Sequence, residues 1–145
     1  MNGERFRAVV AVHLLLARGD SVLLLRRANT GYEDGSYSVP AGHFEGGETA
    51  RAAGVREAAE EVGIVLGEDD LSLAVVMHRQ AAPERVDFFF SATNWVGEPR
   101  NAEPDKCDHL MWAPASELPN NTVPYVRCGI DAWRSGIRYA EFGWD

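Results

Sequence analysis

The most informative stretch of the chain, residues 42–64, reads GHFEGGETARAAGVREAAEEVGI. Its first part is rich in glycine, which predicts a tight turn where the backbone can approach a ligand closely. Thr49 is a good N-cap residue, and Gly63 is the residue type that most often ends a helix. The stretch therefore predicts a glycine-rich turn followed by a helix that ends at about Val62.

The predicted helix has two different faces when its residues are placed at about 100° intervals. One is narrow and made of small apolar residues, which suits packing on a sheet: Val55, Ala58, Ala59 and Val62. Glu57, Glu60 and Glu61 share the opposite face. Like charges at this spacing cost about a few tenths of a kcal/mol per pair. A hard divalent cation would offset that cost; the other interpretation is an ordinary solvated acidic face.

The same stretch resembles the Nudix box at every defining position. The matching residues are Gly42, Glu48 and the run REAAEEVGI at 56–64, and the preceding residues 38–41 also resemble the family's approach to the box. This resemblance implies the Nudix fold, an α/β/α sandwich around a mixed β-sheet. It also implies hydrolysis of a nucleoside diphosphate linked to another group, with Mg²⁺ or Mn²⁺ as cofactor. Metal ions neutralise phosphate oxygens and lower the pKa of bound water, so an acidic site can accept an anionic substrate.

The resemblance also implies roles for individual residues. Glu57 and Glu61 correspond to the main metal ligands, with Glu60 close behind, and the backbone carbonyl of Ala41 corresponds to a further ligand in MutT-type members. Glu48 and Arg56 correspond to a pair that holds the loop against the helix. These residues form the predicted catalytic and metal-binding set.

The general base has two candidates. Nudix enzymes use either a box glutamate, here Glu60, or an acid from a distant loop. Glu103, in the polar loop 101–106, resembles the additional metal-binding glutamate of MutT-type enzymes. The alternative interpretation of Glu103 is a plain loop acid.

Three residues are candidates for binding the substrate. Arg26 and Arg27 end a predicted strand, and alternation places them on opposite faces, so one could hold a phosphate while the other is solvated. Asn121 stands about where MutT-type enzymes place an asparagine that reads the base, although an asparagine before a helix is more often a cap.

Other polar and aromatic residues carry weaker indications. Trp112 could stack on a base but is more often a core residue on so short a strand, and His13 is expected to be a satisfied core histidine. His78 and Arg79, at a strand end, are possible substrate contacts.

Composition and charge narrow the function classes. The 145 residues predict a single domain over 1–145, and 46% hydrophobic residues suffice for a core. The net charge of −8 argues against nucleic-acid polymers and anionic membranes as partners. No apolar run reaches the length of a membrane span, and two cysteines are too few for a disulfide scaffold, so we expect a cytoplasmic monomer or homodimer.

Outside the box, the pattern predicts a mixed sheet with a helix on each side. The expected strands are 6–17 and 21–25, joined as a hairpin by Gly19 and Asp20, followed by 37–40, 71–78, 86–96 and 109–112. A second helix is expected over 123–134, beginning near Pro124. The tail 139–145 gives no clear prediction.

A nucleoside or deoxynucleoside triphosphate is the expected substrate. The chain is short and MutT-like, and it lacks the signals of Nudix enzymes that cleave ADP-ribose or coenzyme A. The alternatives are a hydrolase of nucleotide sugars or dinucleoside polyphosphates and a non-catalytic nucleotide-binding Nudix module. An isopentenyl-diphosphate isomerase is less consistent, because neither Cys107 nor Cys128 lies near the box.

Overall fold

The computed structural model describes residues 3–145, which fold around one mixed β-sheet. Its strands are β1 (Val9–Arg18), β2 (Ser21–Arg27), β3 (Tyr37–Ser38), β4 (Ala41–His43), β5 (Ser72–Arg79), β6 (Arg85–Ala92), β7 (Cys107–Pro114) and β8 (Tyr139–Phe142). The chain also forms two α-helices and a short 3₁₀ turn, namely α1 (Ala50–Val62), α2 (Pro124–Arg134) and η1 (Glu68–Asp70).

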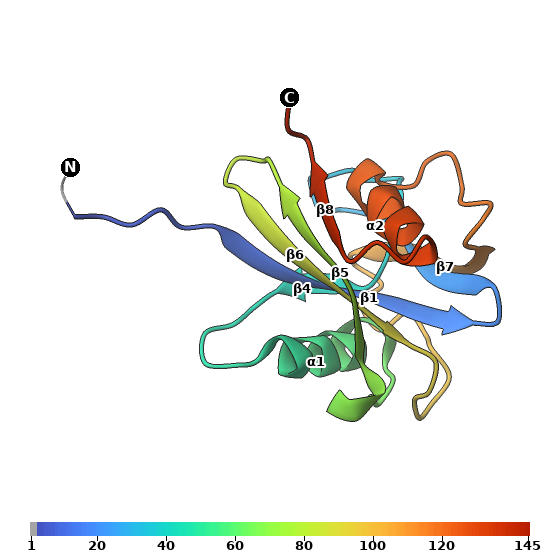
Figure 1. Cartoon of the computed structure of the whole chain (residues 1–145). Helices are drawn as coiled ribbons and strands as arrows, with labels where there is room; N and C mark the ends of the chain where they lie inside the picture. Colours follow the sequence, from blue (N-terminus) through green and yellow to red (C-terminus); the bar gives the residue numbers. More distant parts are fainter. Residues whose placement is uncertain (1–2) are drawn as a thin grey trace.

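The strand order is β3-β2-β1-β6-β5-β8, with β4 paired to β1 and β7 paired to β2. The β1–β6 and β5–β8 pairs are parallel, and the remaining pairs are antiparallel. Helices α1 and α2 cover opposite faces of the sheet (Figure 1). The predicted α/β/α sandwich with a mixed sheet is confirmed.

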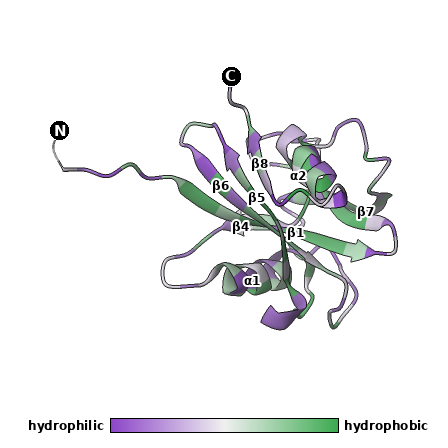
Figure 2. Ribbon diagram, viewed as in Figure 1, coloured by the Kyte–Doolittle hydropathy of each residue, from purple (hydrophilic) through white to green (hydrophobic). Residues whose placement is uncertain are grey.

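Strand β1 is the centre of the core, and residues 11–17 are all buried. Leu14 packs in the cluster on the α1 side together with Ala58, whereas its neighbour Leu15 packs in the cluster on the α2 side with Ile130. Because successive side chains point to opposite faces, a continuous apolar run is needed to serve both helices. Figure 2 shows this run as one of the most hydrophobic parts of the ribbon.

Both ends of α1 are as predicted. The Thr49 hydroxyl accepts a hydrogen bond from the Ala52 N–H at 3.1 Å. At the other end Gly63 has a φ of 69°, and its N–H donates to the carbonyl of Ala59 at 3.2 Å. Helix α2 begins at Pro124, as expected. Within residues 3–145, neither helix has the length and apolar character needed to cross a membrane.

Two strand ends differ from the prediction by more than two residues. The strand expected from residue 6 begins at Val9, because the preceding residues lead away from the sheet and leave Phe6 72% exposed (Figure 1). The strand expected to run to residue 96 ends at Ala92, because its antiparallel partner β5 begins at Ser72, opposite Ser91. Val96 instead pairs with Val65 in an isolated bridge.

Two strands were not predicted. Strand β4 lies within the glycine-rich turn and pairs with β1, with Val12 opposite Gly42 and His13 opposite Ala41. Strand β8 lies in the tail and adds to the edge of the sheet parallel to β5. Strand β4 is three residues long and β8 four, so both depend on partners distant in sequence.

The contact between α2 and the sheet gives a stability prediction. A Cβ added at Gly129 would lie 2.6 Å from ring carbons of Phe89, a fully buried side chain of β6. We expect Gly129→Ala to destabilise the fold by about 1–3 kcal/mol, because overpacking outweighs the better helix propensity of alanine. Urea unfolding measures the change.

Gly54→Ala is the matched control on the other helix. There the added Cβ meets only the ends of the flexible Leu71 and Leu14 side chains, at 3.1 and 3.3 Å. Its free energy of unfolding should stay close to that of the wild type. Equal stability of the two variants would contradict the packing of Gly129 on Phe89.

Candidate active site

A close contact between β4 and α1 places the acidic face of the helix against the glycine-rich turn. Gly42 lies so near the Glu57 carboxylate that a Cβ at this position would overlap its oxygen atoms. Glu57 is only 7% exposed as a result. The absence of a side chain at Gly42 is therefore what allows a carboxylate to lie against the strand.

Arg56 is the cation that holds this acidic region together. Its Nε and Nη2 atoms donate to the two carboxylate oxygens of Glu48, at 3.2 and 2.7 Å. Its Nη1 atom donates to Glu57 at 2.7 Å and lies 3.5 Å from a carboxylate oxygen of Glu60. The pKa of Glu48 is lowered, mainly by the hydrogen bonds from Arg56. The arrangement matches the expected pairing of Glu48 with Arg56 and extends it to the helix acids.

Glu61 lies one turn beyond Glu57 and is half-buried. Its carboxylate accepts a hydrogen bond from the Ala41 N–H at 3.1 Å. Burial raises its pKa well above the usual range, and the negative charges of Glu57 and Glu103 raise it further. Burial likewise raises the pKa of Glu57, against the opposing effect of Arg56.

Glu103 reaches the same region from the loop that follows β6. The Asn101 side chain shapes this loop by accepting from the Glu103 N–H at 3.1 Å and donating to the Cys107 carbonyl at 2.6 Å. The Ala102 N–H donates to the Glu61 backbone carbonyl at 3.0 Å, so the loop is bonded to the last turn of α1. The charge of Glu103 raises the pKa of both Glu57 and Glu61, which places it among them.

The chemistry of this set of donors fits a hard divalent cation. Mutual repulsion and partial desolvation destabilise the charged carboxylates, whose main counter-charge is Arg56. A bound positive ion would stabilise them. The carboxylates are at present engaged with Arg56 and Ala41, and no three acidic, histidine or cysteine side chains within residues 3–145 form a ready metal cage. Metal binding would exchange these hydrogen bonds for metal–oxygen contacts.

A cavity of about 920 Å³ opens beside the acids. Its wall includes Ala41, Gly42, Glu61 and Glu103, and the other charged residues that line it are Arg27, Glu33, Arg79, Arg85 and Lys106. Aromatic side chains from three elements also line it, namely Tyr32, Tyr125 and Phe142. The cavity thus joins an acidic wall to cationic and aromatic surfaces, which suits a nucleotide.

The two strand-end arginines have different surroundings, in line with their expected opposite orientation. Arg26 points away from the cavity and donates from Nε to Asp108 at 2.6 Å. Arg27 lines the cavity, and its guanidinium donates to the Tyr32 carbonyl and to the Thr30 hydroxyl, at 2.7 and 3.1 Å. No carboxylate within residues 3–145 forms an ion pair with Arg27, so its charge is available to a substrate.

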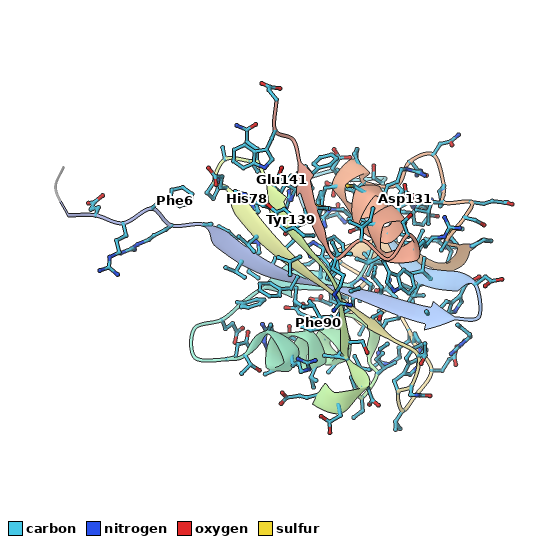
Figure 3. All side chains as sticks on the ribbon, in the orientation of Figure 1. Phe6, His78, Phe90, Asp131, Tyr139 and Glu141 are labelled. Atoms are coloured by element: carbon cyan, nitrogen blue, oxygen red, sulfur yellow. The ribbon has the colours of Figure 1, made fainter. Side chains whose placement is uncertain are left out.

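Three other candidates lie outside the cavity wall. The Asn121 amide donates to the Gly35 carbonyl at 2.9 Å, and the N-cap of α2 is Val123, so Asn121 is not the helix cap. Trp112 is half-buried and stacks with Trp95. His78 lies beside β8, opposite Glu141 (Figure 3).

Sequence reasoning was wrong about His13 and missed several residues of the wall. His13 is 1% exposed, but its Nδ1 atom has no hydrogen-bond partner, so it is not a satisfied core histidine. Burial lowers its pKa to about 4. Tyr32, Arg85 and Tyr125 were not singled out, because each lies in an ordinary polar context in the chain. Two signals pointed to this region: Arg79, an expected possible substrate contact that does line the cavity, and the position of His13 within an apolar run.

Comparison with known proteins agrees with the geometry. The model of the NUDIX domain family matches residues 4–128. A relative from Escherichia coli K12, named 8-oxo-dGTP diphosphatase, is 27% identical over 120 residues, covering 81% of this chain and 92% of the relative.

Solved structures of similar proteins cover nearly the whole chain. A MutT NUDIX hydrolase from Burkholderia pseudomallei superposes with a TM-score of 0.80 at 27% identity, covering 87% of this chain and 98% of the other. A NUDIX hydrolase from Nitrosomonas europaea gives a TM-score of 0.76 at 25% identity, covering 92% and 93%.

The contact between Gly42 and Glu57 gives a prediction for the site. The methyl group of Gly42→Ala would displace the Glu57 carboxylate, which is the end of a flexible side chain, so the fold should survive. We expect the melting temperature to change little and phosphohydrolase turnover to fall by about tenfold or more. Gly46→Ala is the control, because nothing lies within 4 Å of its added Cβ. Wild-type turnover in Gly42→Ala would contradict a functional position for Glu57.

Proposed function

This chain belongs to the NUDIX family, and we propose that it cleaves a nucleoside or deoxynucleoside triphosphate to the monophosphate and pyrophosphate. It is a MutT-like hydrolase of phosphoanhydride bonds, and its family generally uses divalent metal ions and acts on nucleotides. One observation carries the proposal: Glu61 of α1, Glu103 and the uncompensated Arg27 lie on the wall of the same cavity. A polyphosphate needs carboxylates that hold a metal ion to neutralise its oxygens, and a guanidinium that binds those oxygens directly.

Two features support a triphosphate as the substrate. The relative named 8-oxo-dGTP diphosphatase matches over 92% of its length, so the two chains have similar extents. The cavity volume of about 920 Å³ falls within the usual range for small-molecule sites, about 300–1,000 Å³. The proposed substrate therefore has one nucleoside and a short phosphate chain.

We assign the metal site to Glu57 and Glu61, with Glu60 and the Ala41 carbonyl as further ligands and Mg²⁺ as the ion. When bound, the ion neutralises phosphate oxygens and lowers the pKa of the attacking water. Arg56 fixes the position of Glu57 through its Nη1 atom, at 2.7 Å, while Glu48 fixes Arg56. These two residues act on the reaction by positioning the ligands.

Arg27 is the proposed phosphate-binding residue at the strand end. Its guanidinium is fixed by two hydrogen bonds to the loop that follows β2, and it carries no ion pair there. Arg26 is less suitable, because its guanidinium is already paired with Asp108. The contact between Asn121 and a base stays a prediction, since its amide is bound to Gly35.

The general base is Glu60 or Glu103. Glu60 has a 54% exposed side chain and can exchange protons with water directly. Glu103 lines the cavity, and its negative charge raises the pKa of Glu61. Both can accept a proton from a water molecule held between the acids and the phosphate chain.

The reaction itself is tested with nucleoside triphosphates, dinucleoside polyphosphates and nucleotide sugars in the presence of Mg²⁺. We expect a monophosphate and pyrophosphate from a triphosphate, identified by product mass, and loss of turnover in excess chelator, because the carboxylates repel an unneutralised phosphate chain. Faster cleavage of a conjugate than of any triphosphate would favour the alternative substrate class. Full turnover in chelator would reject the metal mechanism, and no turnover of any substrate would favour a binding module.

A second prediction separates the glutamates by role. Glu57→Gln and Glu61→Gln should raise the Mg²⁺ concentration needed for half-maximal rate, because each removes a charged ligand. Loss of the base, in Glu60→Gln or Glu103→Gln, should lower kcat by about 10²–10⁴ at saturating Mg²⁺. The exposed Glu68→Gln serves as the control for removing a charge elsewhere. Unchanged metal requirement and turnover in both Glu57→Gln and Glu61→Gln would reject this site.

A further inference from the structure

A cluster of polar groups lies on the α2 side of the sheet, where an apolar core would be expected. His13, Arg79 and Asp87 are 1%, 9% and 0% exposed, and the half-buried Tyr125 joins them from α2. Burying charged and polar groups costs free energy unless every one is paired. The proposed chemistry at the acids of α1 does not use this cluster, so it needs another explanation.

Asp87 fixes the guanidinium of Arg79 and leaves part of it unused. Arg79 donates from Nε to one carboxylate oxygen at 2.8 Å and from Nη2 to the other at 3.3 Å. The guanidinium also lies over the Tyr125 ring, 3.7 Å from its centroid. No hydrogen bond among residues 3–145 uses the Nη1 atom, so an oriented NH₂ group remains free to donate.

The pair of His13 and Tyr125 has a spare donor as well. The two side chains share one hydrogen bond of 3.0 Å, between His13 Nε2 and the Tyr125 hydroxyl. A neutral imidazole and a phenol carry one proton each, and the shared bond uses one of them. The remaining proton lies on the tyrosine oxygen in one tautomer and on His13 Nδ1 in the other. Nδ1 is itself buried, so the donor that the cavity can reach is the tyrosine hydroxyl. A protonated imidazole would only add a donor.

These donors lie on the same cavity as Glu61 and Glu103. His13, Arg79 and Tyr125 all line it, whereas Asp87 lies behind them and does not. The aromatic side chains Tyr32 and Phe142 line the same cavity. A planar group in this cavity would have aromatic neighbours and the free donors of Arg79 and Tyr125 on the wall.

We infer that Arg79 and Tyr125, with His13 bonded to the tyrosine hydroxyl, are specificity-determining residues that bind the carbonyl oxygen of an oxo-substituted nucleobase and disfavour amino-substituted bases. A base carbonyl accepts from these donors, whereas an exocyclic amine presents its own donors to them and leaves both sides unpaired. This inference rests on the proposed function, since it assumes that the cavity holds a nucleotide. It names the part of the nucleotide that the cluster recognises.

Asp87 is a positioning residue in this arrangement. It has no access to the cavity, but it neutralises Arg79 and fixes the direction of its free NH₂ group. Phosphate oxygens could accept from the same donors. We favour the base, because Arg27 and Glu61 already line the same cavity, where the proposed phosphate and metal sites lie.

The test measures binding rather than turnover. Calorimetry in the presence of Mg²⁺ compares inosine with adenosine 5′-monophosphate and uridine with cytidine 5′-monophosphate, because each pair differs at the oxo or amino position. Inorganic pyrophosphate reports on phosphate contacts alone. The variants are Arg79→Lys, which keeps the charge beside Asp87 but removes the NH₂ group, and Tyr125→Phe. Tyr139→Phe is the control, since it removes an exposed hydroxyl outside the cavity.

We expect the wild type to bind the oxo member of each pair about tenfold or more tightly. Arg79→Lys should reduce that ratio to within about threefold, Tyr125→Phe should reduce it less because the free NH₂ group of Arg79 remains, and Tyr139→Phe should leave it unchanged. Pyrophosphate binding should stay the same in all variants, and melting temperatures show that each variant is folded.

Three results would overturn the inference. They are equal binding of oxo and amino members by the wild type, an unchanged ratio in folded Arg79→Lys, and weaker pyrophosphate binding that parallels the loss of monophosphate binding. A protein that binds inosine monophosphate selectively but cleaves no triphosphate would support the inference while rejecting the proposed hydrolysis.

Discussion

Repulsion among the carboxylates of one helix and one loop is the constraint on which this structure depends. Glu57, Glu61 and Glu103 are brought together with less positive charge than they need: Glu103 raises the pKa of both helix acids, and Glu57 raises that of Glu61. Arg56 offsets part of that repulsion and ties the helix to the glycine-rich turn through Glu48. The fold can carry this strain because β1, buried on both faces, provides a rigid base for β4 and α1. The negative charge that Arg56 leaves uncompensated gives this side of the cavity an affinity for cations.

The cavity combines two opposite electrostatic requirements in a protein of net charge −8. Its acidic wall favours a cation, while Arg27, Arg85 and Lys106 line it without a carboxylate in ion-pair contact among residues 3–145. An anionic ligand that arrives with a metal ion satisfies both walls, whereas an anion alone meets the repulsion of the acids. Nucleotide binding and metal binding should therefore be coupled in this family member.

The parts that could be predicted from sequence are those decided by local residues. Thr49 and Gly63 mark the ends of α1 because capping depends on neighbours within one turn. The shared face of Glu57 and Glu61 follows from helix geometry alone. Strand β4 could not be predicted, since three residues of a glycine-rich turn become a strand only through pairing with β1. The sequence singled out Arg79 as a possible substrate contact, but its grouping with His13 and Tyr125 could not be predicted, because that grouping joins residues from separate strands and from α2.

The hydrogen bonds between the loop of Glu103 and the end of α1 have a consequence for local motion. Both the Arg100 and Ala102 N–H groups donate to carbonyls of the last helical turn, at Val62 and Glu61. Fraying of this turn would therefore break the loop contacts together with the helix, as one cooperative opening unit. Glu61 and Glu103 would leave the site at the same time, so the two acids are present or absent as a pair. The helix C-terminus thereby sets the lifetime of the assembled site.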